Sequence, residues 1–244
     1  MSNLEGKSIL VTGANRGIGR ALVDEALERG ARKVYAGTRV DLSHSDERVI
    51  PVTLDVTNSA QIERAVAGIE SLDVLINNAG IALYDDLTDR AVLERHLAVH
   101  VHGPNDLIQA SLPLLSRSKG AVVNILSVNA LAPLPMIPSY SISKAAAFSL
   151  TQSLRLLLAP QGVAVHAVLT GPVDTDMSRG LDIPKDAPET VAKAVFVGVA
   201  RGDAEIFPDG LSALLAESWA AGASKALERQ YAEMVAKVTA DAQA

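Results

Sequence analysis

The sequence contains no cysteine, no long hydrophobic run and no excess of positive charge. The absence of cysteine excludes disulfides and thiolate metal sites, and it agrees with a cytoplasmic location. No apolar stretch approaches the ~20 residues that a membrane-spanning helix needs. The net charge of −6, with basic residues scattered along the chain, argues against a nucleic-acid-binding protein. We therefore expect a protein that binds neither membrane nor nucleic acid.

The sequence also has no internal repeat and no low-complexity linker. Its one proline-rich stretch is 133–138, which we interpret as a loop near a site. Residues 1–7 lack a basic region followed by a long apolar region, so we expect no secretory signal. A chain of 244 residues with 48% hydrophobic and 20% charged residues fits one α/β domain. We predict a single domain over 1–244.

Short β-type runs alternate with helical stretches along the chain, which indicates βαβ units and a mainly parallel sheet. We predict seven strands, at 8–12, 33–36, 49–54, 74–77, 121–126, 164–169 and 205–207. We predict helices at 17–29, 59–68, 90–101, 104–116, 140–158, 188–201 and about 212–238. This pattern predicts a doubly wound α/β fold with helices on both faces of the sheet.

Tyr140 and Lys144 are four residues apart in a predicted helix, so their side chains share one face. A nearby cation favours the phenolate and lowers the pKa of a tyrosine, which can then act as a general acid and base. Ser127 follows a predicted strand and is placed to donate a hydrogen bond to a substrate oxygen. These three residues are candidate catalytic groups.

A glycine-rich turn, Thr12–Gly19, follows the first predicted strand and opens the first predicted helix. This is the setting of a dinucleotide-binding turn, in which glycines let the backbone approach a pyrophosphate and the helix N-terminus offers N–H groups. The spacing is Gly-x-x-x-Gly-x-Gly, with glycines at 13, 17 and 19.

Together these segments resemble the short-chain dehydrogenase/reductase family in its standard-length branch. The matching motifs occur in the family's order over nearly the whole chain, and the resemblance implies a Rossmann fold. The cofactor-contacting residues it implies are Gly13, Asn15, Arg16, Gly17, Ile18, Gly19, Thr38, Arg39, Asp55, Val56, Asn78, Ala79, Gly80, Tyr140, Lys144, Gly171, Val173 and Thr175.

The residue that ends the second strand discriminates between the two nicotinamide cofactors. An acid there would bond the ribose 2′-hydroxyl and repel a 2′-phosphate, but this chain has Arg39 and no acid before Asp41. The planar guanidinium of Arg39 can hold a phosphate, and Arg16 can approach the same phosphate from the glycine turn. Family members with a basic residue at both positions favour NADP, so we expect NADP(H).

The resemblance implies reversible hydride transfer between the nicotinamide and a carbonyl/alcohol pair. Tyr140 would exchange the proton, Lys144 would hold the ribose and Ser127 would polarise the carbonyl. The pocket residues we expect are Val128, Leu131, Met136 and Ile137, which favour a small, fairly apolar ketone or aldehyde. No metal is expected, although His96 and His100 have a spacing that metal sites use.

One departure from the family pattern concerns His100, which stands where the family usually has an asparagine that helps to hold a water. Imidazole can bond water, but it is bulkier than a carboxamide and titrates near neutral pH. His100 could relay protons in place of the asparagine, add an acid/base group to the substrate pocket, or slow turnover.

Two other functions stay open. The first is a relative that uses the same residues without net redox chemistry, such as an epimerase or a dehalogenase. The second is an NADP-sensing regulator that has lost catalysis, which His100 alone keeps open. The resemblance also implies a homodimer or homotetramer formed through the helices at 104–116 and 140–158.

Overall fold

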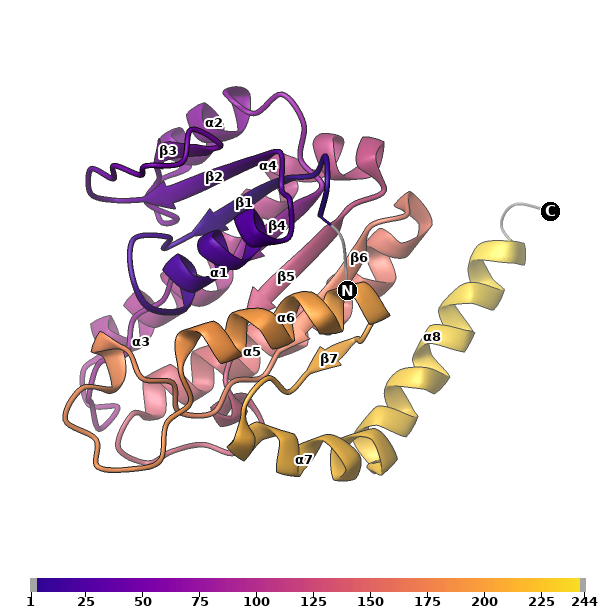
Figure 1. Ribbon diagram of the computed structural model, residues 1–244. Helices are drawn as coiled ribbons and strands as arrows, with labels where there is room; N and C mark the ends of the chain where they lie inside the picture. Colours follow the sequence, from indigo (N-terminus) through magenta and orange to yellow (C-terminus); the bar gives the residue numbers. More distant parts are fainter. Residues whose placement is uncertain (1–3, 242–244) are drawn as a thin grey trace.

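The computed structural model describes residues 4–241, with the side chains of 4–234, and its centre is one seven-stranded sheet. Every named strand pair is parallel, and the strand order is β3-β2-β1-β4-β5-β6-β7 (Figure 1). The strands are β1 (Ser8–Thr12), β2 (Lys33–Thr38), β3 (Val49–Thr53), β4 (Val74–Asn77), β5 (Ala121–Ile125), β6 (Ala164–Val168) and β7 (Glu205–Ile206). The predicted doubly wound Rossmann fold is confirmed.

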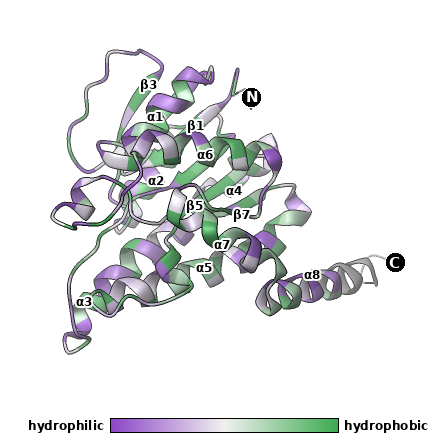
Figure 2. Ribbon diagram, turned by 60° about the horizontal axis from the view of Figure 1, so that its bottom comes forward, coloured by the Kyte–Doolittle hydropathy of each residue, from purple (hydrophilic) through white to green (hydrophobic). Residues whose placement is uncertain are grey.

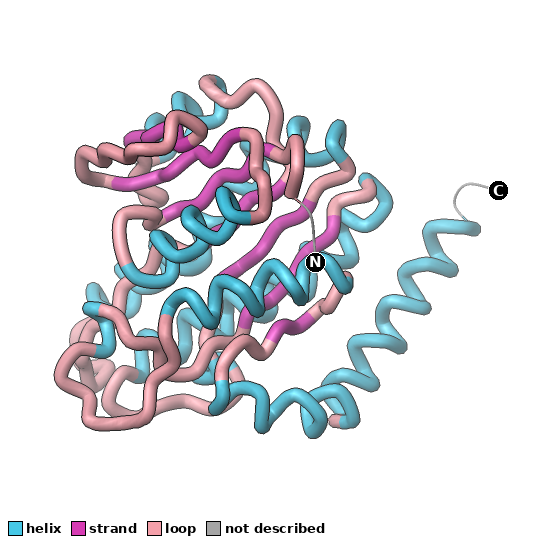
Figure 3. Tube along the Cα trace, viewed as in Figure 1, coloured by secondary structure: helices cyan, strands magenta, loops and turns pink. Residues whose placement is uncertain are grey.

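Helices cover both faces of the sheet (Figures 1 and 3). One face carries α1 (Gly17–Glu28) and α6 (Pro188–Arg201), and the other carries α2 (Ser59–Ala67), α4 (Gly103–Ser118) and α5 (Pro138–Leu158). The short helix α3 (Arg90–Leu97) leads towards α4 and packs beside α5.

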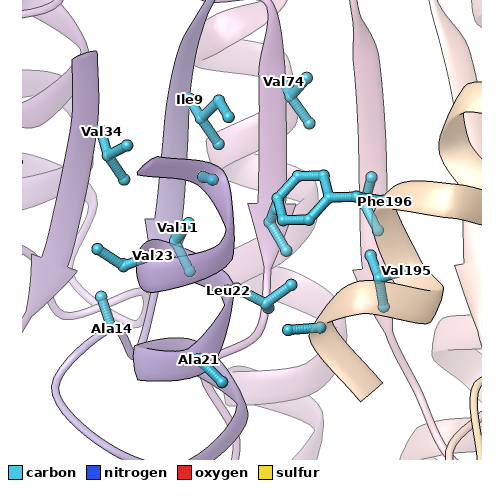
Figure 4. Packing of buried hydrophobic residues seen from close by; sticks show 14 of the residues in the cluster. Ile9, Val11, Ala14, Ala21, Leu22, Val23, Val34, Val74, Val195 and Phe196 are labelled. Carbon is cyan, nitrogen blue, oxygen red and sulfur yellow. The ribbon is translucent and has the colours of Figure 1, made fainter. Parts of the chain in front are cut away.

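Two hydrophobic layers hold these helices on the sheet, because strands buried on both faces offer apolar side chains to both. On the α1 and α6 side, Leu22 and Phe196 pack over Ile9 and Val11 of β1 (Figure 4). On the other side, Leu107 of α4 and Leu154 of α5 belong to the layer that covers the sheet there. The rigid sheet fixes the positions of the loops at its carboxyl edge.

The segment from Arg90 to Ser118 differs from the prediction of two separate helices. A π-helical turn, Ala98–His102, joins α3 to α4 without a break. Pro104, which has no N–H to donate, lies just after this wider turn. Such turns often occur at functional sites, and this one contains His100.

The C-terminal part also differs from the prediction of one helix. It forms α7 (Gly210–Ala221) and α8 (Ala223–Asp241), which separate where Gly222 takes an extended backbone conformation. Arg155 of α5 pairs with Glu205 of β7, and Lys225 of α8 pairs with the same carboxylate at 2.7 Å. These ion pairs attach the start of α8 to the sheet, and the rest of α8 projects from the body (Figures 1 and 2). Among the described residues, no helix combines the length and the apolar character needed to span a membrane.

Candidate functional site

A cleft of about 520 Å³ lies at the carboxyl edge of the sheet. Ligands of doubly wound sheets bind at this edge, where the strand order reverses, and here the reversal lies between β1 and β4. All eighteen residues predicted to contact a cofactor line this cleft, together with Ser127 and His100. Segments that follow six strands, β1 to β6, and lie far apart in the sequence thus meet at one site.

Three positions of the glycine-rich turn require glycine. Gly13 and Gly17 have positive φ angles of 66° and 53°, which favour glycine. A Cβ atom on Gly19 would lie 2.1 Å from the main-chain oxygen of Gly13. The residue before α1, Arg16, provides no side-chain cap, and the first turn of the helix has no acidic residue. The N-terminus of α1 therefore suits an anion such as a phosphate group.

Asn78 joins the glycine turn to the end of β4. Its side-chain Nδ2 donates to the main-chain oxygens of Thr12 and Gly13, at 2.9 and 3.2 Å, and its main-chain N–H donates to the hydroxyl of Thr12. On the opposite wall, the N–H of Gly171 donates to the carboxylate of Asp209 at 2.7 Å. These bonds fix the two walls of the cleft without any ligand.

Ser127, Tyr140 and Lys144 lie together deep in the cleft. All three are buried, and the ammonium nitrogen of Lys144 lies 5.6 Å from the centre of the Tyr140 ring. The Lys144 Nζ donates to the main-chain oxygen of Ile125 at 2.9 Å. The Ser127 hydroxyl accepts a hydrogen bond from the N–H of Asn129, which fixes its position at the start of a short 3₁₀ helix.

Burial governs the ionisation of this tyrosine and lysine. It raises the pKa of Tyr140 to about 12, and the hydrogen bond from Ser127 opposes that rise only in part. Burial also lowers the pKa of Lys144 to about 8. Loss of hydration therefore dominates the pKa of Tyr140 in this structure. The lowering expected from Lys144 together with the positive nicotinamide stays a prediction.

His100 uses both of its ring nitrogens within the protein. Its Nε2 accepts a hydrogen bond from the N–H of Ile81 at 3.1 Å, so the ring proton is on Nδ1, which faces the hydroxyl of Ser143 at 2.8 Å. That hydroxyl in turn donates to the main-chain oxygen of Tyr140. Burial, followed by the charge of Lys144, holds the pKa of His100 well below its ordinary value of 6.5. The ring is therefore neutral at physiological pH.

His96, one turn earlier, repeats this arrangement. Its Nε2 accepts from the N–H of Leu83 at 3.2 Å, and its Nδ1 lies 2.8 Å from the main-chain oxygen of Val92. The two imidazoles thus bind alternate amides of the segment that follows β4, and both rings meet Tyr140 edge to face, at 6.2 Å from His96 and 5.5 Å from His100.

The same segment is held at a third point by Asp85. Its carboxylate accepts hydrogen bonds from the N–H and the hydroxyl of Ser139, at the start of α5. Ile137, the residue before α5, has an apolar side chain that cannot cap the helix. Asp85 therefore supplies the cap from a distant loop. Residues 81–85 and the tyrosine helix therefore form one connected unit.

Apart from the buried Lys144, the charged residues that line the cleft are Arg16, Arg39, Asp55 and Asp176. Arg39 follows β2 and forms no ion pair with the described residues, and its charge acts on Asp55. Burial opposes ionisation of Asp55, but bonds from Thr57 and the Arg39 charge outweigh it and lower its pKa. Arg16 pairs with Asp176 at 3.1 Å across the mouth of the cleft.

The predicted substrate residues divide into three groups. Val128 and Ile137 line the cleft, and Leu131 lines a neighbouring cavity. Met136 is exposed and lines neither, so the prediction of Met136 as a pocket residue was wrong. Met136 points out of the site because the proline-rich loop forms only one wall with its ends. Leu181 and Ile183 also line the cleft, and they belong to the segment after Thr175 that was expected to form a wall. Sequence reasoning missed Ile81, Ala82, Tyr84 and Leu211, which carry no motif and reach the cleft only through the fold.

Comparisons with known proteins agree with this geometry. Residues 7–185 match the family model described as short chain dehydrogenase. An uncharacterized oxidoreductase of Staphylococcus aureus is 32% identical over 219 residues, which cover 82% of this chain and 94% of the relative. An 11-beta-hydroxysteroid dehydrogenase-like protein of Arabidopsis thaliana is 30% identical over 230 residues, which cover 84% of this chain and 74% of the relative.

Solved structures are also similar. A short chain dehydrogenase from Burkholderia cenocepacia, in complex with NADP, superimposes with a TM-score of 0.85 at 38% identity, covering 93% of this chain and 98% of the other. The ligand-free aldohexose dehydrogenase of Thermoplasma acidophilum gives a TM-score of 0.77 at 27% identity, covering 87% of this chain and 96% of the other.

Proposed function

Because this chain belongs to the short-chain dehydrogenase/reductase family, we propose that it is an NADP(H)-dependent carbonyl reductase or alcohol dehydrogenase. The observation that carries this proposal is the burial of Ser127, Tyr140 and Lys144 together at the inner end of a cleft whose outer end presents Arg39. We propose that 1–244 act as one catalytic domain, since all seven strands join one sheet.

NADP(H) fits the donors in the cleft. The uncapped N-terminus of α1 and the three glycines of the turn suit the pyrophosphate, and Arg39 suits a 2′-phosphate. The NADP complex of the Burkholderia structure supports the same choice. Asp55 would meet the adenine, and Val173 and Thr175 would meet the carboxamide. When bound, the reduced cofactor supplies a hydride to the carbonyl carbon.

The three buried residues have distinct roles in the proposed reaction. The Ser127 hydroxyl donates to the carbonyl oxygen of the substrate, where negative charge develops. Tyr140, whose raised pKa keeps it a neutral phenol at physiological pH, gives its proton to that oxygen and becomes a phenolate, and in the reverse direction the phenolate accepts the proton of the alcohol. The ammonium of Lys144 has donors beyond the one used on Ile125 and can bind ribose hydroxyls.

We assign to His100 the role of a positioning residue. A proton relay through its Nε2 would require loss of the bond from Ile81, and the ring is neutral. The imidazole instead connects the segment after β4, through Ser143, to the backbone of Tyr140. Gly80 leaves space for the imidazole of His100, since a Cβ at position 80 would lie only 3.3 Å from the His100 Nε2.

The substrate proposed is a small, fairly apolar ketone or aldehyde. The residues at the substrate end of the cleft, including Ile81, Tyr84, Leu134 and Ile137, carry no charge. The segment between Thr175 and α6 is short, so it forms only a small lid, which favours a substrate of modest size.

We also propose a homodimer or homotetramer assembled through α4 and α5. Ile142 and Leu157 are exposed on α5, and burial against a second copy would remove them from water. Light scattering after size exclusion measures the mass directly, and a monomer at micromolar concentration would contradict this assembly.

The first experiment follows NADPH absorbance with a panel of alkyl and aryl ketones and aldehydes. The native protein should turn over members of the panel, and Tyr140→Phe should lower kcat by about 100-fold or more with its fold intact by circular dichroism. Binding of NADPH without turnover of any substrate would refute the reductase proposal and favour a cofactor sensor.

A second experiment separates the possible roles of His100. His100→Asn, which can still accept a bond from Ile81, should keep more activity than His100→Leu, which cannot. A positioning role predicts that the pH profile of kcat above about pH 6 is the same in the native protein and in His100→Asn, because the native imidazole stays neutral there. Loss of a titration step in the Asn variant would instead identify His100 as a proton carrier.

A further inference from the structure

A second cavity, of about 410 Å³, lies beside the cleft between the loop after β5 and helix α7. Its lining is mostly apolar and consists of Val128, Asn129, Leu131, Ala132, Leu211, Leu214, Leu215, Ser218 and Trp219. None of these residues carries a charge. The cavity therefore suits an uncharged apolar group.

The cavity and the cleft share a wall. Val128, Asn129 and Leu211 line both, and Val128 directly follows the Ser127 hydroxyl. Leu211 lies close to the opposite wall of the cleft, since a Cβ on Gly171 would be 3.1 Å from the Cβ of Leu211. A ligand bound at Ser127 thus has the second cavity as its immediate neighbour.

Helix α7, which forms the outer wall, is anchored at both ends. At its start, Asp209 and Ser212 bond each other in a capping box, and the Asp209 carboxylate also binds the N–H of Gly171. Near its end, the Trp219 ring packs on Phe148 of α5 with 5.3 Å between ring centres. Leu214, between these anchors, is 77% exposed although it lines the cavity (Figure 2 shows the hydrophobic positions of α7). The wall is held in place by these anchors, and between them the Leu214 side chain is left largely open to solvent.

We propose that this cavity is a subsite for an apolar, uncharged arm of the substrate, whose carbonyl group lies at Ser127 and Tyr140. The arm passes over Val128 and Leu211 and lies against Leu214, Leu215 and Trp219. This inference rests on the proposed carbonyl reductase function and extends its substrates from small ketones and aldehydes to those with a longer apolar arm. The cleft alone must also hold the cofactor, so a second space is needed for a longer substrate.

Chain-length dependence of turnover tests the subsite. For methyl ketones with ethyl, butyl and heptyl arms, kcat/KM should rise by up to about fourfold for each CH₂ group that becomes buried. Leu214→Glu places a charge in the subsite and should lower the ratio of kcat/KM between heptyl and ethyl ketones by about tenfold or more. The matched control is Leu227→Glu, an exposed leucine of α8 outside the cavity, which should keep the native ratio.

Binding can be measured without turnover, because Trp219 is the only tryptophan of the chain and lines the cavity. Methyl heptyl ketone should change the tryptophan emission of the native protein and of Leu227→Glu saturably, and it should change that of Leu214→Glu much more weakly. The ethyl ketone should have little effect at the same concentration.

The outcomes separate the two proposals. Turnover of all three ketones with equal kcat/KM, and no change in emission, would overturn the subsite and leave the reductase function standing. No turnover of any ketone would overturn the reductase function, while the emission change would still report occupancy of the cavity. A change of molecular mass in Leu214→Glu, with equal loss for all substrates, would overturn the subsite in favour of contact with a second copy.

Discussion

Replacing the buried Lys144 with methionine should change how the stability of the protein depends on pH. Methionine has a similar length and no charge, so Lys144→Met removes the titrating group while largely filling its space. It also leaves the main-chain oxygen of Ile125 without its donor, at a cost of about 1–3 kcal/mol that does not vary with pH. The pH dependence therefore isolates the effect of the charge.

The magnitude follows from the pKa of Lys144, which burial lowers from 10.5 to about 8. Between these values the unfolded chain binds the proton and the folded chain does not, so the free energy of unfolding rises with pH. At about 1.4 kcal/mol per pH unit, charged Lys144 destabilises the native protein by ~3 kcal/mol at neutral pH. By about pH 9.5 roughly 2 kcal/mol of this cost has disappeared.

Urea unfolding followed by circular dichroism, without cofactor, measures this difference. The free energy of unfolding of native protein minus that of Lys144→Met should increase by about 2 kcal/mol between about pH 7 and pH 9.5. The exposed Lys193→Met is the control and should follow the native protein at both pH values. Parallel pH dependence of the native protein and Lys144→Met would refute the reasoning, because it would show that the lysine keeps its ordinary pKa in the fold.

Three further predictions concern the walls of the cleft. Gly19→Ala should weaken NADPH binding by about tenfold or more in a fluorescence titration, because the new Cβ forces the glycine turn open; unchanged affinity would contradict this. Asp85→Ala should lower the free energy of unfolding by about 1 kcal/mol and reduce kcat/KM, because α5 loses its cap. The control is Asp86→Ala, which should leave kcat/KM unchanged because the Asp86 carboxylate bonds only to Thr88 in its own loop. Asp176→Asn should tighten NADPH binding a few-fold, because it frees Arg16 from its ion pair and removes a negative charge beside the phosphates. Equal or weaker binding would count against Arg16 as a phosphate-binding residue.

The sequence predicted most of the fold because its signals are local. Alternating apolar runs and helical stretches placed all seven strands to within two residues of their observed bounds. The errors arose where a glycine or proline was the only signal. Pro104 led to the prediction of a break between two helices, but a π-helical turn joins them. Gly222 was not recognised as the point where the C-terminal helix divides.

Most of the candidate site could also be predicted from the sequence. The carboxyl ends of parallel strands meet at one edge, so motifs placed there converge in any such fold. The prediction for Met136 failed because a loop residue has no periodicity that fixes its direction, and Tyr84 was missed for the same reason. Leu211 was missed because no local pattern places the start of α7 beside the cleft.

By itself, the sequence determined which groups share the site, because Tyr140 and Lys144 follow helical spacing and the glycine turn follows a strand. Only the tertiary structure decided their physical state. The pKa values of Tyr140 and Lys144 depend on how much water surrounds them, and the tautomer of His100 depends on Ile81 and Ser143, which lie 19 and 43 residues away. Hydration and long-range hydrogen bonds are properties of the packed chain, which no local pattern encodes.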